Sequence, residues 1–205
     1  MKIIAPVFIV LALLILAIIR FKDLKIRHIG RQGEKEVSSI LKTLPRSCRV
    51  LNDYLLPYGC GTTQIDHIVI SPVGVFVVET KNYSGAVYGS DYKESWSHYV
   101  GNKNYEFYSP IFQNNSHIDC LRVLLGENVP MYSCIVFADR CRLKVTSKYA
   151  WVGNTSALKE FIEKKLERAS VLSEERIALF TNYLVKKNIT ARKVRKTHDR
   201  AVANK

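Results

Sequence analysis

The chain is organised around one stretch, Gln64-Ile65-Asp66-His67-Ile68-Val69-Ile70-Ser71-Pro72-Val73-Gly74-Val75-Phe76-Val77-Val78-Glu79-Thr80-Lys81. Two runs of apolar, mostly β-branched residues flank a Ser-Pro-Val-Gly turn, and this pattern predicts a β-hairpin. If residues 71–74 form the loop, Ile70 faces Val75, and each further pair lies one residue farther out on both strands. A loop one residue longer or shorter would turn one strand's side chains to the opposite face of the sheet.

Polar side chains gather at the open end of this hairpin. In the expected register Asp66 faces Glu79, and Gln64 faces Lys81. Because side chains alternate between the two faces of a strand, all four emerge on one face. The alternative is a pair of strands whose polar ends simply reach solvent.

Two carboxylates on facing strands repel each other unless a cation lies between them, and their oxygens favour a hard divalent ion such as Mg²⁺ or Mn²⁺. Such an ion would polarise a phosphate oxygen and lower the pKa of a bound water. Lys81 lies two residues from Glu79 and could orient that water or offset negative charge in the transition state. The hairpin therefore indicates metal-dependent chemistry on a phosphate group.

Further short motifs follow one another in order along the chain. They are Gly30-Arg31-Gln32-Gly33-Glu34-Lys35-Glu36-Val37, Gln64-Ile65-Asp66-His67, Gly74-Val75-Phe76-Val77-Val78-Glu79-Thr80-Lys81-Asn82, Gly85, Trp96 and Ser109-Pro110-Ile111-Phe112-Gln113-Asn114. Together they resemble the NERD (nuclease-related) domain over roughly residues 30–140. Asp66 with Glu79-Thr80-Lys81 also resembles the D…(D/E)-x-K signature of the restriction-endonuclease-like, PD-(D/E)xK nucleases. Ser109 departs from the asparagine that the family pattern leads us to expect.

This resemblance implies an α/β fold with a restriction-endonuclease-like αβββαβ core. The order helix, three strands, helix, strand agrees with it, although that order alone fits other α/β sheets. The resemblance further implies a nuclease in which Asp66, Glu79 and the backbone carbonyl of Thr80 hold Mg²⁺ or Mn²⁺, and Lys81 orients the attacking water.

Three more residues are expected to support the metal or the phosphate. They are Glu34, Gln64 and Gln113. For Glu34 the alternative is a carboxylate that favours the positive end of a helix beginning at about Gly33. His117 lies one helical turn from Gln113, and we expect it to be solvated.

The N-terminus carries an uncharged run from Ile3 to Ile19, interrupted only by Pro6. Its length is at the lower limit for a helix that spans a bilayer, which needs about 20 residues. We therefore expect a transmembrane helix over residues 1–21, entering the membrane through residues 3–19. A cleavable signal peptide is the rival interpretation, weakened by the single Lys2 before the run and by the absence of an Ala-x-Ala site after it.

Flanking charge predicts the orientation of this segment. Five basic residues follow it within a short distance, Arg20, Lys22, Lys25, Arg27 and Arg31. Positive charge tends to stay on the cytoplasmic side, so we expect a single-pass protein of the cell membrane with a cytoplasmic C-terminal domain.

The five cysteines are odd in number and lack a Cys-x-x-Cys pair, which indicates neither a disulfide framework nor a zinc site. We expect most of them to be small buried hydrophobes.

The chain has 205 residues, 47% of them apolar, and can hold the membrane segment and one further domain with a real core. We expect a basic linker over 22–29, the nuclease-like domain over 30–152, a pair of helices over 153–187 and a flexible basic tail over 188–205. Within the domain, the expected helices cover 33–44 and 110–125, and strands other than the hairpin cover 48–56, 86–88, 132–138 and 149–152.

The net charge of +13 permits binding to nucleic acid, with DNA favoured over RNA, and equally permits contact with anionic lipid. Aromatic residues between 90 and 108 could stack on bases, although packing within an irregular β segment is the preferred interpretation.

Three functional hypotheses follow. The first is a membrane-anchored cytoplasmic nuclease, the second a non-catalytic module that binds nucleic acid or protein at the membrane, and the third an adaptor that faces lipid.

Overall fold

The computed structural model describes residues 4–203, including the side chains of residues 13–22, 24–199 and 201. The elements in chain order are α1 (Ile4–Leu41), β1 (Arg49–Tyr58), β2 (Gly61–Ser71), β3 (Gly74–Lys81), β4 (Gly85–Ser90), β5 (Ser95–Val100), β6 (Lys103–Tyr108), α2 (Pro110–Leu125), β7 (Met131–Phe137), β8 (Cys141–Thr146), β9 (Trp151–Asn154), α3 (Thr155–Leu166), α4 (Glu174–Lys187) and α5 (Arg192–Ala203).

The strands β2 and β3 form the central hairpin. Ile70 pairs with Val75 as expected, and the register continues outward to His67 and Val78. The turn is tighter than expected, because only residues 72–73 lie between the paired ends of the strands. The apolar alternation therefore predicted the correct register, since any other would turn apolar residues away from the core.

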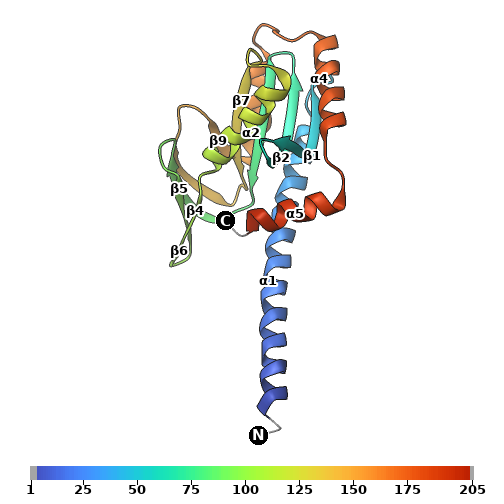
Figure 1. Cartoon of the computed structure of the whole chain (residues 1–205). Helices are drawn as coiled ribbons and strands as arrows, with labels where there is room; N and C mark the ends of the chain where they lie inside the picture. The colour runs from blue at the N-terminus through green and yellow to red at the C-terminus, as the bar shows by residue number, and fades with distance from the viewer. Residues whose placement is uncertain (1–3, 204–205) are drawn as a thin grey trace.

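The hairpin belongs to a five-stranded sheet of order β1-β2-β3-β7-β9 (Figure 1). The first three strands run antiparallel, while β7 and β9 pair in parallel. Helices α2 and α4 pack on one face of this sheet, through residues such as Leu121 and Phe180. On the other face α1 and α3 pack, through residues such as Leu41 and Ile162. The predicted mixed α/β architecture is confirmed.

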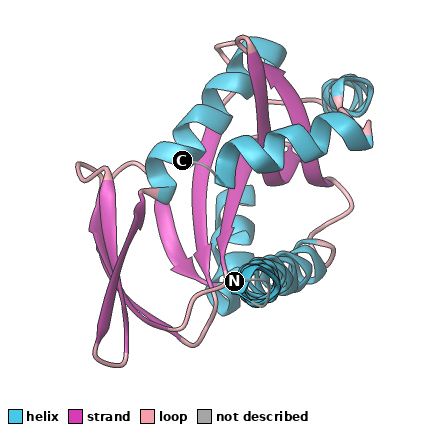
Figure 2. Cartoon of the chain, turned by 60° about the horizontal axis from the view of Figure 1, so that its bottom comes forward, coloured by secondary structure: helices cyan, strands magenta, loops and turns pink. Residues whose placement is uncertain are grey.

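A second, four-stranded sheet of order β6-β5-β4-β8 stands to one side of the molecule (Figure 2). Its inner face closes over a third cluster of buried residues that includes Val87, Trp96, Ile111 and Phe137. The ring of Trp96 stacks on that of Phe137 at 6.4 Å between centroids. The sequence pattern predicts β4. It predicts only an irregular β segment where β5 and β6 lie, and it does not predict β8.

The N-terminal helix is longer than expected. The linker predicted over residues 22–29 continues the helix, so that α1 runs unbroken to Leu41 and projects from the domain (Figure 1). Its residues between Pro6 and Pro45 include no proline, so no backbone N–H is removed from the helix there. Residues 192–203 of the predicted flexible tail form α5, which lies across α1.

In the part of the chain that the structure describes, no helix is both long and apolar enough to cross a membrane. The transmembrane helix predicted over residues 1–21 is thus not supported, and its first three residues lie outside the described residues. In the sequence the uncharged run extends from Ile3 to Ile19 and is ended by Arg20, so that it is shorter than the roughly 20 residues that a bilayer requires.

Gly74 offers a test of the central hairpin. Its φ is +133°, and a Cβ atom added there would lie 2.5 Å from the carbonyl oxygen of Pro130. We expect Gly74→Ala to lower the free energy of unfolding by about 2–3 kcal/mol, because both the backbone and the neighbouring strand must shift. The control is Gly101→Ala, where φ is +59° but no atom lies within 4 Å, and where about 1 kcal/mol is expected. Equal losses in urea titrations would contradict the packing at Gly74.

The cysteines offer a second test. All five are free, and four of them are buried, as predicted for most: Cys48, Cys120, Cys134 and Cys141. Burial raises the pKa of the Cys120 thiol to about 11. At about pH 8 a thiol reagent should therefore react quickly with one thiol per chain, the exposed Cys60 in the β1–β2 turn. Cys60→Ser should remove this fast phase, and a second fast thiol would show that the core is looser than described.

Candidate active site

The two strands of the hairpin separate at Asp66. Beyond the pair of His67 and Val78, β3 continues along β7 only. The Asp66 carboxylate spans the opening, because its Oδ2 accepts a 2.8 Å hydrogen bond from the N–H of Thr80. Asp66 and the Glu79-Thr80-Lys81 segment are therefore brought together by a side chain that bridges diverging strands, and not by the continued ladder that the sequence suggested.

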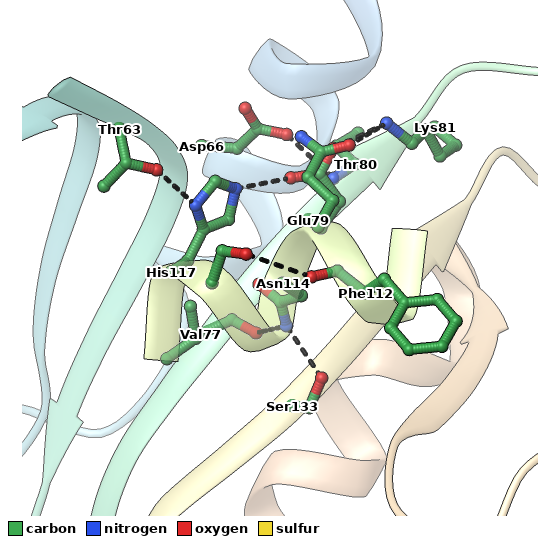
Figure 3. A network of polar contacts seen from close by, with 12 residues as sticks. Thr63, Asp66, Val77, Glu79, Thr80, Lys81, Phe112, Asn114, His117 and Ser133 are labelled. Carbon is green, nitrogen blue, oxygen red and sulfur yellow. Dashed lines mark hydrogen bonds and ion pairs between the residues drawn. The ribbon is translucent and has the colours of Figure 1, made fainter. Parts of the chain in front are cut away.

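Glu79 and Lys81 lie on the face of β3 that α2 covers (Figure 3). The Nζ of Lys81 donates to Oε1 of Glu79 at 2.6 Å and to Oε1 of Gln113 at 3.0 Å. The side chain of Glu79 is 3% exposed and that of Lys81 is 17% exposed. Three residues predicted for the site, from one strand and one helix, thus form one contiguous network.

Helix α2 is placed to deliver Gln113. Ser109 caps its N-terminus, with its side chain accepting from the N–H of Phe112, and Pro110 occupies the first turn where no N–H is needed. Serine therefore serves in place of the asparagine that the family pattern suggested. The end of the helix follows at Leu125, as the sequence predicts.

Asn114 fastens α2 to the sheet beneath the site. Its Nδ2 donates to the carbonyl of Val77 at 2.9 Å and to Oγ of Ser133 at 2.8 Å (Figure 3). Asn114 is fully buried, so both bonds form in a medium where an unpaired donor would be costly. This contact fixes which turn of α2 faces Glu79.

His117 was expected to be solvated, and that expectation is wrong. The ring is buried, with Nδ1 at 2.7 Å from Oγ1 of Thr63 and Nε2 at 3.3 Å from Oε2 of Glu79. The latter two atoms are within ion-pair range but are not aligned as a hydrogen bond. The available signal was the one-turn spacing from Gln113, which places both side chains on the same face of α2.

Glu34 approaches the site from α1. Gly33 makes this possible, because a Cβ atom there would lie 2.6 Å from the Cβ of Asn82, the residue after Lys81. Asn82 also donates to the carbonyl of Ile29, one turn earlier on the helix. Glu34 is half-buried and close enough for its charge to act on Asp66.

Gln64 was expected to face Lys81, and the structure places it elsewhere. Its Nε2 donates to Oδ1 of Asp53 at 2.7 Å. Asp53 has a left-handed backbone, with φ at 58°, and the register of β1 with β2 skips it. Arg195 of α5 donates to both carboxylate oxygens of Asp53, at 3.0 and 3.1 Å. The divergence of β2 from β3 is the reason, since it carries Gln64 away with β1.

The charges of the cluster are strongly coupled. Burial, followed by the charges of Glu79 and Glu34, raises the pKa of Asp66 well above its usual range. Burial also acts to raise the pKa of Glu79, but Lys81 and His117 outweigh it and hold that pKa below its usual value. Burial acts to lower the pKa of Lys81, and the charge of Glu79 outweighs this and raises it. Lys81 is therefore a cation at neutral pH and cannot accept a proton.

The carboxylate oxygens of this cluster suit a hard cation in their chemistry. Oε2 of Glu79 is buried without a hydrogen bond, and burial together with the neighbouring acids disfavours the charged form of Asp66. A divalent ion would relieve both conditions. Across the described residues, however, no group of three or more His, Cys, Asp or Glu side chains is arranged to hold a metal. Any ion here would rest on Asp66, Glu79 and backbone or water oxygens.

Comparison with known proteins adds to this geometry. Residues 29–138 match the family model of the nuclease-related domain, NERD. An uncharacterized protein of Bacillus anthracis is 36% identical over 182 residues, which cover 86% of this chain and 84% of that protein. No solved structure matches the chain.

The buried pair of Glu79 and Lys81 predicts a stability effect. Lys81→Met should lower the free energy of unfolding by about 3 kcal/mol, because it leaves the buried Glu79 carboxylate without its main partner. The matched control is Lys159→Met on α3, whose ion pair with Glu163 is 3.7 Å long and exposed, so that less than about 1 kcal/mol is expected. Urea titrations in EDTA measure both. A loss for Lys81→Met no larger than for the control would show that the pair does not support the buried charge.

Proposed function

Since this chain belongs to the nuclease-related domain (NERD) family, we propose that it hydrolyses phosphodiester bonds of nucleic acid at the site of Asp66, Glu79 and Lys81. The observation that carries the proposal is the Lys81 ammonium, held between Glu79 and Gln113 beside the carboxylate of Asp66. A cation can offset the negative charge that develops in phosphodiester hydrolysis, and two acids from neighbouring strands can hold a divalent ion beside it.

Lys81 would act as a charge at this site. It is protonated, so it can donate a hydrogen bond to a phosphate oxygen or an attacking water and offset negative charge that develops there. Lys81 donates one hydrogen bond to Gln113 and another to Glu79, and these two bonds limit the directions in which its Nζ can point. His117 positions Glu79 from the opposite side. The side chain of Gln64 is directed to Asp53, so we assign it no part in the chemistry.

A divalent ion, Mg²⁺ or Mn²⁺, fits this proposal. Asp66, Glu79 and the backbone carbonyl of Thr80 would hold it, and Glu34 would contribute negative charge nearby. When bound, such an ion polarises the phosphate and lowers the pKa of a coordinated water. The Oε2 of Glu79, which is buried without a hydrogen bond, and the raised pKa of Asp66 support the assignment.

A second candidate is a module that binds nucleic acid without cleaving it. One observation favours it. Lys81 lies beside one Glu79 oxygen and His117 beside the other, so the charge of Glu79 has partners without a metal ion. Metal binding separates the candidates. An occupied site must raise the melting temperature as Mg²⁺ or Mn²⁺ is added, with the rise lost in Asp66→Asn.

The location at a cell membrane, with the domain in the cytoplasm, stays a prediction from the N-terminal residues alone. The apolar side chains of α1 that are described, from Leu13 to Ile19, are largely exposed. Fractionation of cells that make the full chain tests the location, and the proposed chemistry does not depend on the result.

The full chain should cleave labelled nucleic acid when Mg²⁺ or Mn²⁺ is present and not in EDTA. Single- and double-stranded DNA and RNA are compared, with DNA expected to be the better substrate. Glu79→Gln should reduce the rate by about a hundredfold or more, because it removes the charge that orients Lys81 and any metal. Glu163→Gln, on the exposed pair of α3, is the control and should be unchanged.

Two results would refute the nuclease. Cleavage that persists in a folded Glu79→Gln protein would place the activity elsewhere. A folded wild-type chain that binds nucleic acid but cleaves none of the four substrates would leave the binding module as the function.

A further inference from the structure

The smaller sheet has two unlike faces. Residues directly opposite one another across paired strands share a face, so the inner face carries Val87 with His98, and Trp96 with Phe107. By the same alternation the outer face carries Tyr88, opposite Ser97 on one side and Lys144 on the other.

The outer face displays an aromatic and basic cluster. The rings of Tyr88 and Tyr99 lie 5.3 Å apart at an interplanar angle of 74°. The Nζ of Lys144 lies 5.1 Å from the centre of the Tyr88 ring. Arg142 pairs with Ala86 and is also exposed on this face.

The rings of Tyr88 and Tyr99 are not buried by packing against other residues. Tyr88 is 39% exposed and Tyr99 is 42% exposed, while Trp96 and Phe107 fill the inner face. Of the aromatic residues between 90 and 108, Trp96 and Phe107 pack as the preferred interpretation expects, whereas Tyr99 stays exposed. Aromatic pairs across strands stabilise a sheet, but that role does not require two rings to remain this accessible beside two cations.

We propose that this outer face binds single-stranded nucleic acid, with Tyr88 and Tyr99 stacking on unpaired bases and Lys144 and Arg142 contacting phosphates. The proposal rests on the proposed function and specifies the form of nucleic acid that it acts on. Unpaired bases offer free aromatic faces to such a platform, whereas the bases of a duplex are stacked on one another. The positive charge of Lys144 and Arg142 complements the phosphate backbone.

The position of the sheet agrees with this role. Only residues 82–84 separate Lys81, at the end of β3, from Gly85, the first residue of β4. The inner face packs on Ile111 of α2, two residues before Gln113. The smaller sheet and the site are thus joined by the three-residue connection from β3 to β4 and by the packing on α2. Among the strand residues of the outer face one carboxylate is found, Glu106 on β6, and two strands separate it from Lys144 on β8.

The experiment measures binding without cleavage. Fluorescence anisotropy in EDTA reports the affinity of the full chain for labelled DNA and RNA strands of about 12 nucleotides, and for the matching DNA duplex. The variants are Tyr88→Ala/Tyr99→Ala and the conservative Tyr88→Phe/Tyr99→Phe. The matched control is Tyr183→Ala on α4, where a ring 37% exposed lies 5.4 Å from Nζ of Lys187, the same chemistry on another element.

We expect the double alanine variant to weaken single-strand binding by about tenfold or more, since stacking on one aromatic ring accounts for roughly that factor. The phenylalanine variant should bind like wild type, because stacking needs the ring and not the hydroxyl. Duplex affinity and the Tyr183→Ala protein should change little.

Several results would overturn the inference. These are unchanged single-strand affinity in the double alanine variant, an equal loss in Tyr183→Ala, or a wild-type preference for the duplex. Any of these results would mean that the outer face binds a protein partner or only stabilises the sheet. Because binding is measured in EDTA, failure here is distinct from failure to cleave: a chain that binds single strands through these tyrosines but never cleaves refutes only the proposed nuclease.

Discussion

A carboxylate charge inside a protein needs partners, and the structure around Glu79 follows from that requirement. Its side chain is 3% exposed, with Lys81 at one oxygen and His117 near the other. Lys81 comes from the same strand, but His117 comes from α2, so the helix must lie over the end of β3. The bonds of Asn114 to Val77 and Ser133 hold it there. Substrate chemistry would use the charges that this arrangement keeps in place.

The second constraint is the separation of β2 from β3. If β2 and β3 had stayed paired, the N–H of Thr80 would have bonded to the backbone of β2. Because the strands diverge, this N–H donates to the carboxylate of Asp66 instead. The opening also lets Glu34 approach from α1, over the close contact between Gly33 and Asn82. Three acids thus lie close to one lysine. Burial, followed by the charges of Glu79 and Glu34, raises the pKa of Asp66, whereas Lys81 and His117 outweigh burial and lower the pKa of Glu79. Their roles in catalysis stay proposals.

The smaller sheet has a structural role, and its outer face is the surface that we propose to bind nucleic acid. Its inner face completes the core over β7 and α2, and its outer face carries exposed rings beside cations. A helix alone could cover the same apolar residues. A sheet presents alternate residues outward at regular spacing, which suits contact with successive bases.

Several elements follow from local patterns in the chain alone. The register of the hairpin is determined because one alternation buries the apolar residues of both strands. The bounds of α2 follow from Ser109, Pro110 and the apolar spacing to Leu125. The grouping of Asp66 with Glu79 and Lys81 at one end of the hairpin was predictable for the same reason.

Contacts between distant segments decided the rest. His117 is buried beside Thr63 and Glu79, and Gln64 turns away because it donates to Asp53, which also accepts from Arg195. The inward or outward direction of each aromatic in β4–β6 likewise depends on what packs beside it. A local pattern specifies which face of an element is apolar, but burial and charge pairing depend on neighbours that only the folded chain brings within a few ångströms.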